Sequence, residues 1–138
     1  MKISRTYRFA ASHRLHSPQL SSAENEELYG KCNNPHGHGH NYALVVGVRG
    51  QVNADTGRIV DIGKLDQYVE ERVLRVFDHK DMNRDVPEFA SSVPTTENLI
   101  LDIERRLRSG WTAAFSGAVL DHVRIRETRR NSFELKEL

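Results

Sequence analysis

The chain has 138 residues, and its 20 Lys and Arg nearly balance its 19 Asp and Glu, so the formal net charge is +1. A chain of this length, with 38% hydrophobic residues, is expected to form one domain, residues 1–138, around a single core. The balanced charge argues against a dedicated nucleic-acid-binding protein, and no apolar stretch is long enough to span a membrane. The single cysteine, Cys32, and the lack of an apolar signal core at the N-terminus favour a cytoplasmic protein.

Two strands and a long loop are expected in the first 50 residues. Alternating apolar and polar side chains predict strands at residues 3–14 and 38–49, with His13 on the apolar face of the first strand. Residues 17–37 are rich in Ser, Asn, Pro, Gly and Glu and predict a loop, with a helical turn around residues 24–28. A loop of this length inside a compact domain is usually functional.

The middle of the chain predicts two helices. A short strand at residues 58–61 precedes the first, with Asp61 placed as its N-cap. Apolar residues then recur at helical spacing at Leu65, Tyr68, Val69, Val73 and Val76. The polar residues 77–94 predict a connecting loop, and the second helix is expected to begin at residues 95–97 and end near Ser109.

Two more strands are expected at the end of the chain. Residues 118–128 predict a strand whose inward face carries Val119 and Val123, and a last strand follows at Phe133 and Leu135. The order strand-strand-helix-helix-strand-strand predicts an α+β fold, with two helices on one side of an antiparallel sheet.

A metal site is indicated by His38-Gly39-His40. Side chains at i and i+2 of a strand point the same way, roughly 6–7 Å apart, so the two imidazoles can converge on one ion. His13, on the apolar face of the other strand, is the best candidate for a third ligand. Three neutral imidazoles with an open fourth position are typical of a catalytic zinc. The alternative is that His38 and His40 are surface residues and that His13 is a hydrogen-bonded core residue.

Two further features could carry chemistry in this chain. Cys32 lies in the turn-rich loop just before these histidines, and a thiolate beside a cation or metal has a lowered pKa and acts as a base or nucleophile. A lone cysteine is more often an inert packing residue. Asp78 adjoins His79 in the sequence, and a carboxylate that fixes a histidine tautomer gives an acid–base relay. The alternative is that Asp78 only caps a turn.

Glu127 is predicted to share the inward face of the strand at residues 118–128, where an unpaired carboxylate is costly. It is therefore expected either to form an internal ion pair or to grip a ligand that offers two adjacent N–H donors; a solvated position at the sheet rim is the third possibility. Thr95 and Thr96 are expected to cap the second helix or to contribute hydroxyls and amides to a ligand site.

Five segments carry a resemblance to a known family. They read Phe-Ala-Ala-Ser-His-Arg-Leu (9–15), Lys-Cys-Asn-Asn-Pro-His-Gly-His-Gly-His-Asn-Tyr (31–42), Phe-Asp-His-Lys (77–80), Pro-Thr-Thr-Glu-Asn (94–98) and Arg-Glu-Thr (126–128). From about Tyr7 to Leu135 the chain resembles the 6-pyruvoyl-tetrahydropterin synthase family. The resemblance implies the tunnelling fold, in which subunits assemble into an oligomeric barrel, typically a homohexamer of two trimers with active sites at subunit interfaces.

The resemblance also implies a reaction and the residues that perform it. The reaction is the zinc-dependent conversion of 7,8-dihydroneopterin triphosphate to 6-pyruvoyl-tetrahydropterin, a lyase step of tetrahydrobiopterin biosynthesis that eliminates triphosphate and needs no external redox cofactor. The implied roles are zinc ligands for His13, His38 and His40; general base for Cys32; relay for Asp78 and His79; anchor of the amino-pyrimidine edge for Glu127; and pocket lining for Thr95 and Thr96.

Two alternatives to this activity are considered. Relatives that form 6-carboxy-tetrahydropterin for queuosine biosynthesis, with loss of acetaldehyde, place their cysteine three residues before His-Gly-His. Here five residues intervene, 33–37, which favours the pyruvoyl-forming group. At residues 129–131 the chain has Arg-Arg-Asn where the animal enzymes have Asp-Asn-Asn. The other alternative is a non-catalytic oligomer that binds pterin or zinc. Lys80 or one of the arginines is expected to contact the triphosphate.

Overall fold

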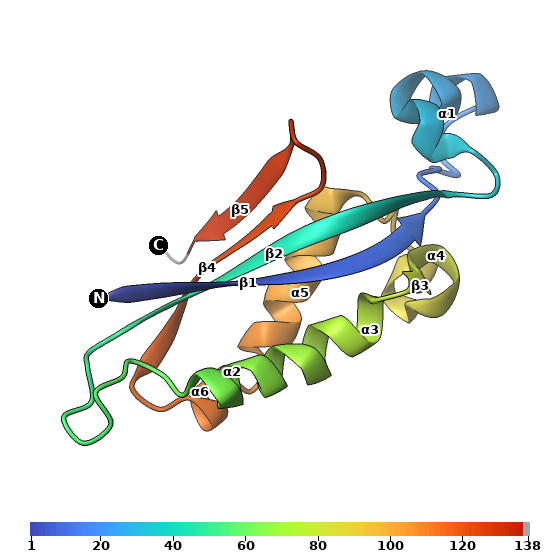
Figure 1. Cartoon of the computed structure of the whole chain (residues 1–138). Helices are drawn as coiled ribbons and strands as arrows, with labels where there is room; N and C mark the ends of the chain where they lie inside the picture. Colours follow the sequence, from blue (N-terminus) through green and yellow to red (C-terminus); the bar gives the residue numbers. More distant parts are fainter. Residues whose placement is uncertain (137–138) are drawn as a thin grey trace.

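A five-stranded sheet forms the centre of the chain (Figure 1). The computed structural model describes residues 1–136, so the last two residues of the expected domain lie outside the described part. The strands are β1 (Lys2–His13), β2 (His38–Gly50), β3 (Lys80–Asp81), β4 (Ala118–Arg126) and β5 (Ser132–Lys136), in the spatial order β3-β1-β2-β4-β5. Neighbours pair antiparallel, except that the two-residue strand β3 runs parallel to β1.

Two long helices cover one face of this sheet (Figure 1). The first long helix comprises α2 (Ile62–Val69), the π-helical segment η2 (Glu70–Leu74) and α3 (Arg75–Phe77), and the second is α5 (Thr96–Arg108). The shorter elements are α1 (Ser22–Tyr29), η1 (Gly30–Asn33), α4 (Met82–Asp85), η3 (Pro87–Ala90) and α6 (Trp111–Ala114). Within residues 1–136, no helix combines the length and apolarity that crossing a membrane requires. The expected α+β fold is confirmed. The sheet face without helices is called the open face below.

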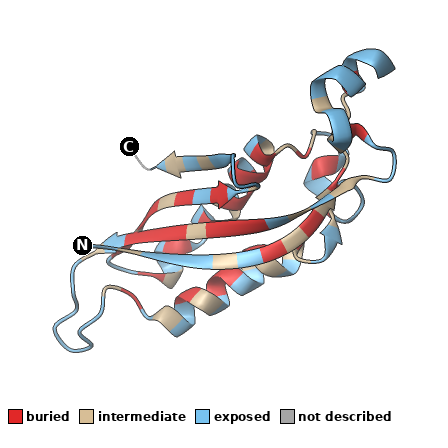
Figure 2. Cartoon of the chain, turned by 45° about the horizontal axis from the view of Figure 1, so that its top comes forward, coloured by how far each residue is buried: buried red, intermediate tan, exposed pale blue. Residues whose placement is uncertain are grey.

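The core lies between the sheet and the helices (Figure 2). Leu44 and Val46 of β2 and Leu99 and Ile103 of α5 are fully buried there. Each such side chain contributes roughly 1.5–3 kcal/mol relative to an exposed one. The apolar face predicted for the first strand is confirmed, since Phe9 of β1 is buried in the same cluster.

Both helix starts are capped as the sequence predicts. The Asp61 side chain accepts a hydrogen bond from the Lys64 N–H at 3.1 Å. The Thr95 hydroxyl accepts one from the Asn98 N–H at 3.2 Å. Each cap satisfies one of the four N–H groups that a helix leaves without an internal partner, which typically contributes about 1 kcal/mol.

The prediction of a short strand at residues 58–61 is wrong, since none of these residues is in a strand and Ile59 and Val60 form bends. Both edges of β2 are already occupied, by β1 and β4, so no free edge is available to this segment there. The preceding loop instead closes on itself, because the Asn53 N–H donates to the Arg58 carbonyl at 2.9 Å.

The loop between β1 and β2 is more ordered than the sequence predicts. The expected helical turn is the two-turn helix α1, which begins with a capping box between Ser21 and Glu24. Asn25 is fully buried, and its side-chain amide donates to the carbonyls of Ser17 and Leu20. These bonds tie the start of the loop to α1 and so place η1, which follows directly.

The π-helical segment keeps the long helix in phase with the sheet. Leu65, Val69, Val73 and Phe77 recur every four residues and are all fully buried. In a regular α-helix each step of four residues turns about 40° too far, or about 120° over three steps. The wider turn of η2 absorbs this drift, so Phe77 faces the core and Val76, the expected core residue, is only partly buried.

A β-bulge in β4 changes which residues face inward. Gly47 pairs with His122, but the register then shifts and leaves Asp121 as the extra residue. Leu120 is therefore buried, and Val119, the expected inward residue, is not. Position 47 has no room for a side chain, because a Cβ there would lie 2.0 Å from His122 Cε1.

Candidate metal and catalytic site

His13, Cys32 and His40 converge at one end of the sheet. Each offers one ligand atom, and these three atoms lie within 4.8 Å of one another. His13 and His40 come from the paired strands β1 and β2, in which His13 is directly opposite His38. Cys32 comes from η1, whose position is set by the bond from the Leu15 N–H to the Cys32 carbonyl at 2.7 Å.

The environment of His13 suits a metal ligand. Its side chain is buried, with 1% exposed, and its Nε2 has no hydrogen-bond partner in the described part of the chain. Burial, together with the charge of His40, lowers the pKa of His13 to about 4, so the ring is neutral at pH 7. An orphaned buried nitrogen costs about 1–3 kcal/mol, which a bound cation would offset.

The donor set and spacing fit zinc. Thiolate and imidazole are ligands that zinc prefers, at about 2.3 and 2.0–2.1 Å. A tetrahedral ion would hold two imidazole nitrogens roughly 3.3 Å apart, so His13 and His40 would need to approach by at most about 1.5 Å, with the Cys32 sulfur beside the ion. His38 is outside the group of three, but its ring centroid lies 4.7 Å from that of His40. The structure thus brings together two of the three expected histidines, with Cys32 among them and His38 alongside.

Glu127 lies just beyond the end of β4 and faces inward. Its Oε1 is 3.3 Å from His40 Nε2, and the two side chains are only 13% and 11% exposed. Of the three possibilities for Glu127, a solvated rim position is therefore wrong, and the carboxylate lies within hydrogen-bond distance of His40. Burial lowers the pKa of His40, and the Glu127 charge opposes that shift.

The Cys32 thiol is perturbed in the opposite direction to that expected. Its Sγ is 4.0 Å from His40 Nε2. Burial, and then the negative charge of Glu127, raise the pKa of the thiol. The expected lowering depends on a cation beside the sulfur, and in the protein alone the charge that acts on the sulfur is the Glu127 carboxylate.

Asp78 and His79 form the expected pair at the end of α3. His79 Nδ1 is 3.0 Å from Asp78 Oδ1, which also accepts a hydrogen bond from the Ala10 N–H at 3.0 Å. The His79 N–H donates to the Ala10 carbonyl at 2.6 Å. His79 has a φ of 60°, a left-handed conformation that histidine adopts more readily than most residues. The backbone of β1 therefore holds both residues in place.

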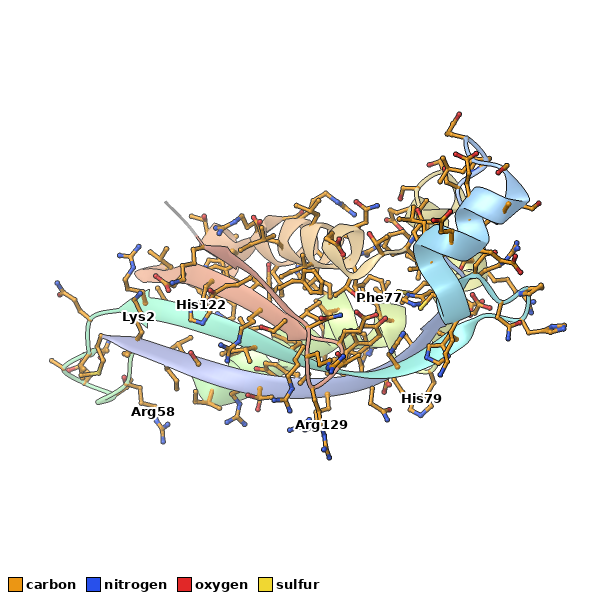
Figure 3. The ribbon with its side chains drawn as sticks, turned by 90° about the horizontal axis from the view of Figure 1, so that it is seen from above. Lys2, Arg58, Phe77, His79, His122 and Arg129 are labelled. Carbon is orange, nitrogen blue, oxygen red and sulfur yellow. The ribbon has the colours of Figure 1, made fainter. Side chains whose placement is uncertain are left out.

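This pair does not join the cluster of its own chain. The His79 side chain (labelled in Figure 3) is 83% exposed. It lines a hollow with Ala10 and Ser12. These two positions alternate with His13 along β1, so they belong to the open face of the sheet. Cys32 and His13 lie on the helix-covered face. Within one chain, the relay and the thiol are thus on opposite sides of the sheet.

The two threonines have different environments. The Thr95 hydroxyl is used in capping α5. Thr96 is buried. Its Oγ1, like His13 Nε2, is a buried side-chain atom without a hydrogen-bond partner among the described residues. Sequence reasoning gave no role to Tyr42, whose buried hydroxyl is 3.5 Å from His13 Nδ1. Its position on the same strand face as His40 was the available signal.

The comparisons with known proteins agree with this geometry. The sequence profile described as 6-pyruvoyl tetrahydropterin synthase matches residues 2–137. The chain belongs to the 6-pyruvoyl tetrahydropterin synthase family. A human relative named 6-pyruvoyl tetrahydrobiopterin synthase is 44% identical over 130 residues, which cover 94% of this chain and 87% of that protein. A Drosophila melanogaster relative of the same name is 43% identical over 129 residues, covering 94% and 75%.

Solved structures place the chain in the same family. The Caenorhabditis elegans 6-pyruvoyl tetrahydropterin synthase aligns with a TM-score of 0.87 and 38% identity, over 100% of this chain and 96% of that one. The Plasmodium falciparum synthase aligns with a TM-score of 0.64 at 16% identity, over 99% and 97%, which shows the fold alone. The fold is the tunnelling fold of the 6-pyruvoyl tetrahydropterin synthase family, and both the expected family and the expected fold are confirmed.

Proposed function

We propose that the chain is a zinc-dependent enzyme that converts 7,8-dihydroneopterin triphosphate to 6-pyruvoyl-tetrahydropterin and eliminates triphosphate. The observation that carries the proposal is the convergence of His13, Cys32 and His40, with Glu127 at 3.3 Å from His40. The names of the relatives support a pterin substrate.

His13 and His40 would hold the zinc, with the adjacent His38 as the third imidazole. When bound, the metal polarises the carbinol oxygens of the substrate and acidifies the neighbouring C–H and O–H bonds. Glu127 accepts two N–H donors from the amino-pyrimidine edge of the pterin, a charge-assisted pair that orients the ring. The side chain of the substrate then extends from Glu127 toward His40.

Cys32 acts as the general base in this proposal. Its thiolate removes a proton from a side-chain carbon of the substrate, and the C–O bond to the triphosphate breaks as the triphosphate leaves. One carbinol becomes a carbonyl as the C=N bond of the dihydropterin ring is reduced. Loss of triphosphate leaves an enol, whose tautomerisation makes the second carbonyl and turns the terminal carbon into a methyl group, so electrons balance within the substrate. The raised pKa of the Cys32 thiol keeps the base protonated until cationic charge is placed beside it.

The relay of Asp78 and His79 would act between subunits. Because His79 faces the open side of the sheet, its imidazole is available to a neighbouring copy rather than to the Cys32 of its own chain. The Asp78 carboxylate fixes its tautomer through the 3.0 Å bond to Nδ1, which leaves Nε2 to exchange protons. This arrangement requires a homo-oligomer, for which a hexamer of two trimers is the proposed form.

Product analysis tests the proposal. Incubation of the zinc-loaded protein with 7,8-dihydroneopterin triphosphate is expected to release triphosphate and to give 6-pyruvoyl-tetrahydropterin by mass spectrometry. Formation of 6-carboxy-tetrahydropterin and acetaldehyde would replace the proposed product with the queuosine-type one. Cys32→Ala is expected to abolish release, whereas His36→Ala, which changes an exposed residue of the same loop, is expected to keep it. An active Cys32→Ala enzyme would overturn the mechanism.

A further inference from the structure

A second cluster of nucleophilic and titratable side chains lies on the open face of the sheet. Ser4 of β1 and His122 of β4 lie on either side of Gly47 of β2, since both residues pair with Gly47. Ser4 Oγ is 3.5 Å from His122 Nε2, and His122 Nδ1 is 2.9 Å from Asp121 Oδ2. A hydroxyl at one ring nitrogen and a carboxylate at the other is the arrangement of hydrolases that use a serine nucleophile.

This cluster is separate from the metal and catalytic site. Ser4 precedes His13 by nine residues on β1. At about 3.3 Å per residue this is a separation of roughly 30 Å. Figure 3 shows Lys2 and His122 toward one end of the sheet and His79 toward the other. The cluster therefore takes no part in the proposed pterin chemistry.

The sheet is shaped to bring the three side chains together. The bulge in β4 leaves Asp121 as the extra residue, so its carboxylate lies beside the ring of the adjacent His122. A Cβ at Gly47 would overlap that ring, so glycine is what lets the ring cross β2 and reach Ser4. The side chains of His122 and Asp121 are only 15% and 9% exposed, whereas Ser4 is exposed. The hydroxyl is thus accessible while the groups behind it are shielded.

The contacts set the protonation of the His122 ring. A carboxylate accepts hydrogen bonds, so Nδ1 carries the proton shared with Asp121, and Nε2 is free to accept the proton of the Ser4 hydroxyl. The hydrogen bond from His122, and then those from Lys2 and Arg49, lower the pKa of Asp121 to about 2, so the carboxylate is ionised at pH 7. The 3.5 Å contact is long, as catalytic hydrogen bonds often are before a substrate binds.

We propose that Ser4 is an activated nucleophile that takes acyl groups from carboxylic esters, with His122 as its base and Asp121 as a positioning residue. Ser4 Oγ bonds to the carbonyl carbon of the ester, and its proton passes to His122 Nε2. The C–O bond to the leaving alcohol then breaks, and the alcohol takes the proton from Nε2. Water, deprotonated by the same nitrogen, hydrolyses the acyl-serine. Lys2, on the same strand face as Ser4, supplies positive charge near the oxyanion formed in each step.

A fluorophosphonate probe tests the nucleophile, because it forms a stable bond with an activated serine. The zinc-loaded protein is incubated with the probe, intact mass gives the rate, and peptide mass spectrometry identifies the labelled residue. One label per chain is expected, on Ser4. Ser4→Ala is expected to abolish this label. Thr6→Ala, which removes a hydroxyl from the same strand face, is expected to keep the wild-type rate.

The roles of the other two residues have separate tests. His122→Gln is expected to slow labelling of Ser4 by about 10²–10⁴-fold, the usual contribution of a positioned base. Asp121→Asn is expected to slow it by about 10²-fold or more. In the same variant the ring proton of His122 is expected to move toward Nε2, as read from the ¹⁵N chemical shifts of the ring. A purely structural role of Asp121 would not change this tautomer, so an unchanged tautomer contradicts the positioning role.

Turnover is measured with 4-nitrophenyl acetate. The wild type is expected to release a burst of nitrophenolate and then to turn over slowly, both above the background of Ser4→Ala. Cys32→Ala is expected to keep the burst from Ser4, so this site and the proposed pterin activity succeed or fail independently. A wild-type protein that is not labelled on Ser4, or a Ser4→Ala protein that is labelled at the wild-type rate, overturns the proposal.

Discussion

Replacing His13 by Phe distinguishes the contribution of His13 to metal binding from its contribution to the stability of the fold. The Phe ring has a similar shape and no ligand atom. In the metal-free protein the change removes an orphaned buried nitrogen, which costs about 1–3 kcal/mol, and loses the long 3.5 Å contact to the Tyr42 hydroxyl. The slightly larger ring adds some crowding. These effects nearly cancel, so the free energy of unfolding of the metal-free variant is expected to stay within about 1 kcal/mol of wild type.

The response to zinc is expected to change much more. Protein zinc sites contribute about 10–16 kcal/mol over four ligands, so one ligand accounts for about 3 kcal/mol, or on the order of 100-fold in Kd. At zinc concentrations 100 times the wild-type Kd, binding stabilises the wild type by about 2.7 kcal/mol. For 138 residues this corresponds to a Tm increase of about 9 °C. In His13→Phe the same zinc concentration is expected to raise the Tm by only about 1 °C.

The pH dependence of unfolding provides an independent check. The pKa of His13 is about 4 in the folded protein against 6.5 ordinarily. Between these values the unfolded chain binds a proton that the folded chain does not, so stability of the metal-free protein falls as pH falls from 6.5 to 4. The loss assigned to His13 is up to about 3 kcal/mol and should be absent in His13→Phe.

Thermal scans with and without zinc, and urea unfolding at several pH values, measure these quantities. His36→Phe, an exposed histidine of the same loop region, is the control and should behave like wild type. A zinc shift of about 9 °C retained in His13→Phe would refute the role of His13 as a ligand. A loss of more than about 3 kcal/mol in the metal-free variant would refute the claim that Nε2 lacks a partner.

Three further predictions concern other parts of the molecule. Glu127→Gln should weaken neopterin binding about tenfold, because neutral hydrogen bonds replace charge-assisted ones. The same substitution should lower the pKa of Cys32, measured from the rate of alkylation against pH in metal-free protein. An unchanged pH profile would contradict the effect of the Glu127 charge on Cys32. Gly47→Ala should cost about 1–3 kcal/mol in urea unfolding, because the His122 ring must move out of its hydrogen bond, and wild-type stability would contradict this. His79→Ala should keep zinc but lose about 10²–10⁴-fold in turnover. When the His79→Ala and Cys32→Ala proteins are refolded together, mixed oligomers should regain part of the activity. No recovery of activity would argue against a site shared between subunits.

Local sequence patterns were sufficient to predict the long strands and the starts of the two long helices. Alternation defined β1 and β2, and the side chains of Asp61 and Thr95 mark their helix starts because a cap depends on residues three positions away. Features that depend on distant partners were not predictable. The shift of Leu120 to the inward face arises from a bulge in the pairing with β2. Phe77 is buried because of a π turn that simple helical spacing does not anticipate.

The candidate site divides in the same way. His13 and His40 could be brought together from sequence because paired strands with known faces allow it. The raised pKa of Cys32 could not be foreseen, since it depends on burial and on Glu127, which is almost one hundred residues away in the chain. The placement of His79 on the open face also depends on tertiary structure, namely the parallel pairing of β3 with β1.

The widened turn of the long helix governs the direction in which the chain leaves it. Shortening η2 by one residue would rotate everything that follows by about 100° about the helix axis. Phe77 would then swing toward solvent, and Asp78 and His79 would lose their docking to the Ala10 backbone. A segment remote from the reacting atoms thus sets the orientation of the proposed acid–base pair about the helix axis. Single-residue insertions or deletions there should eliminate turnover even where the helix itself survives.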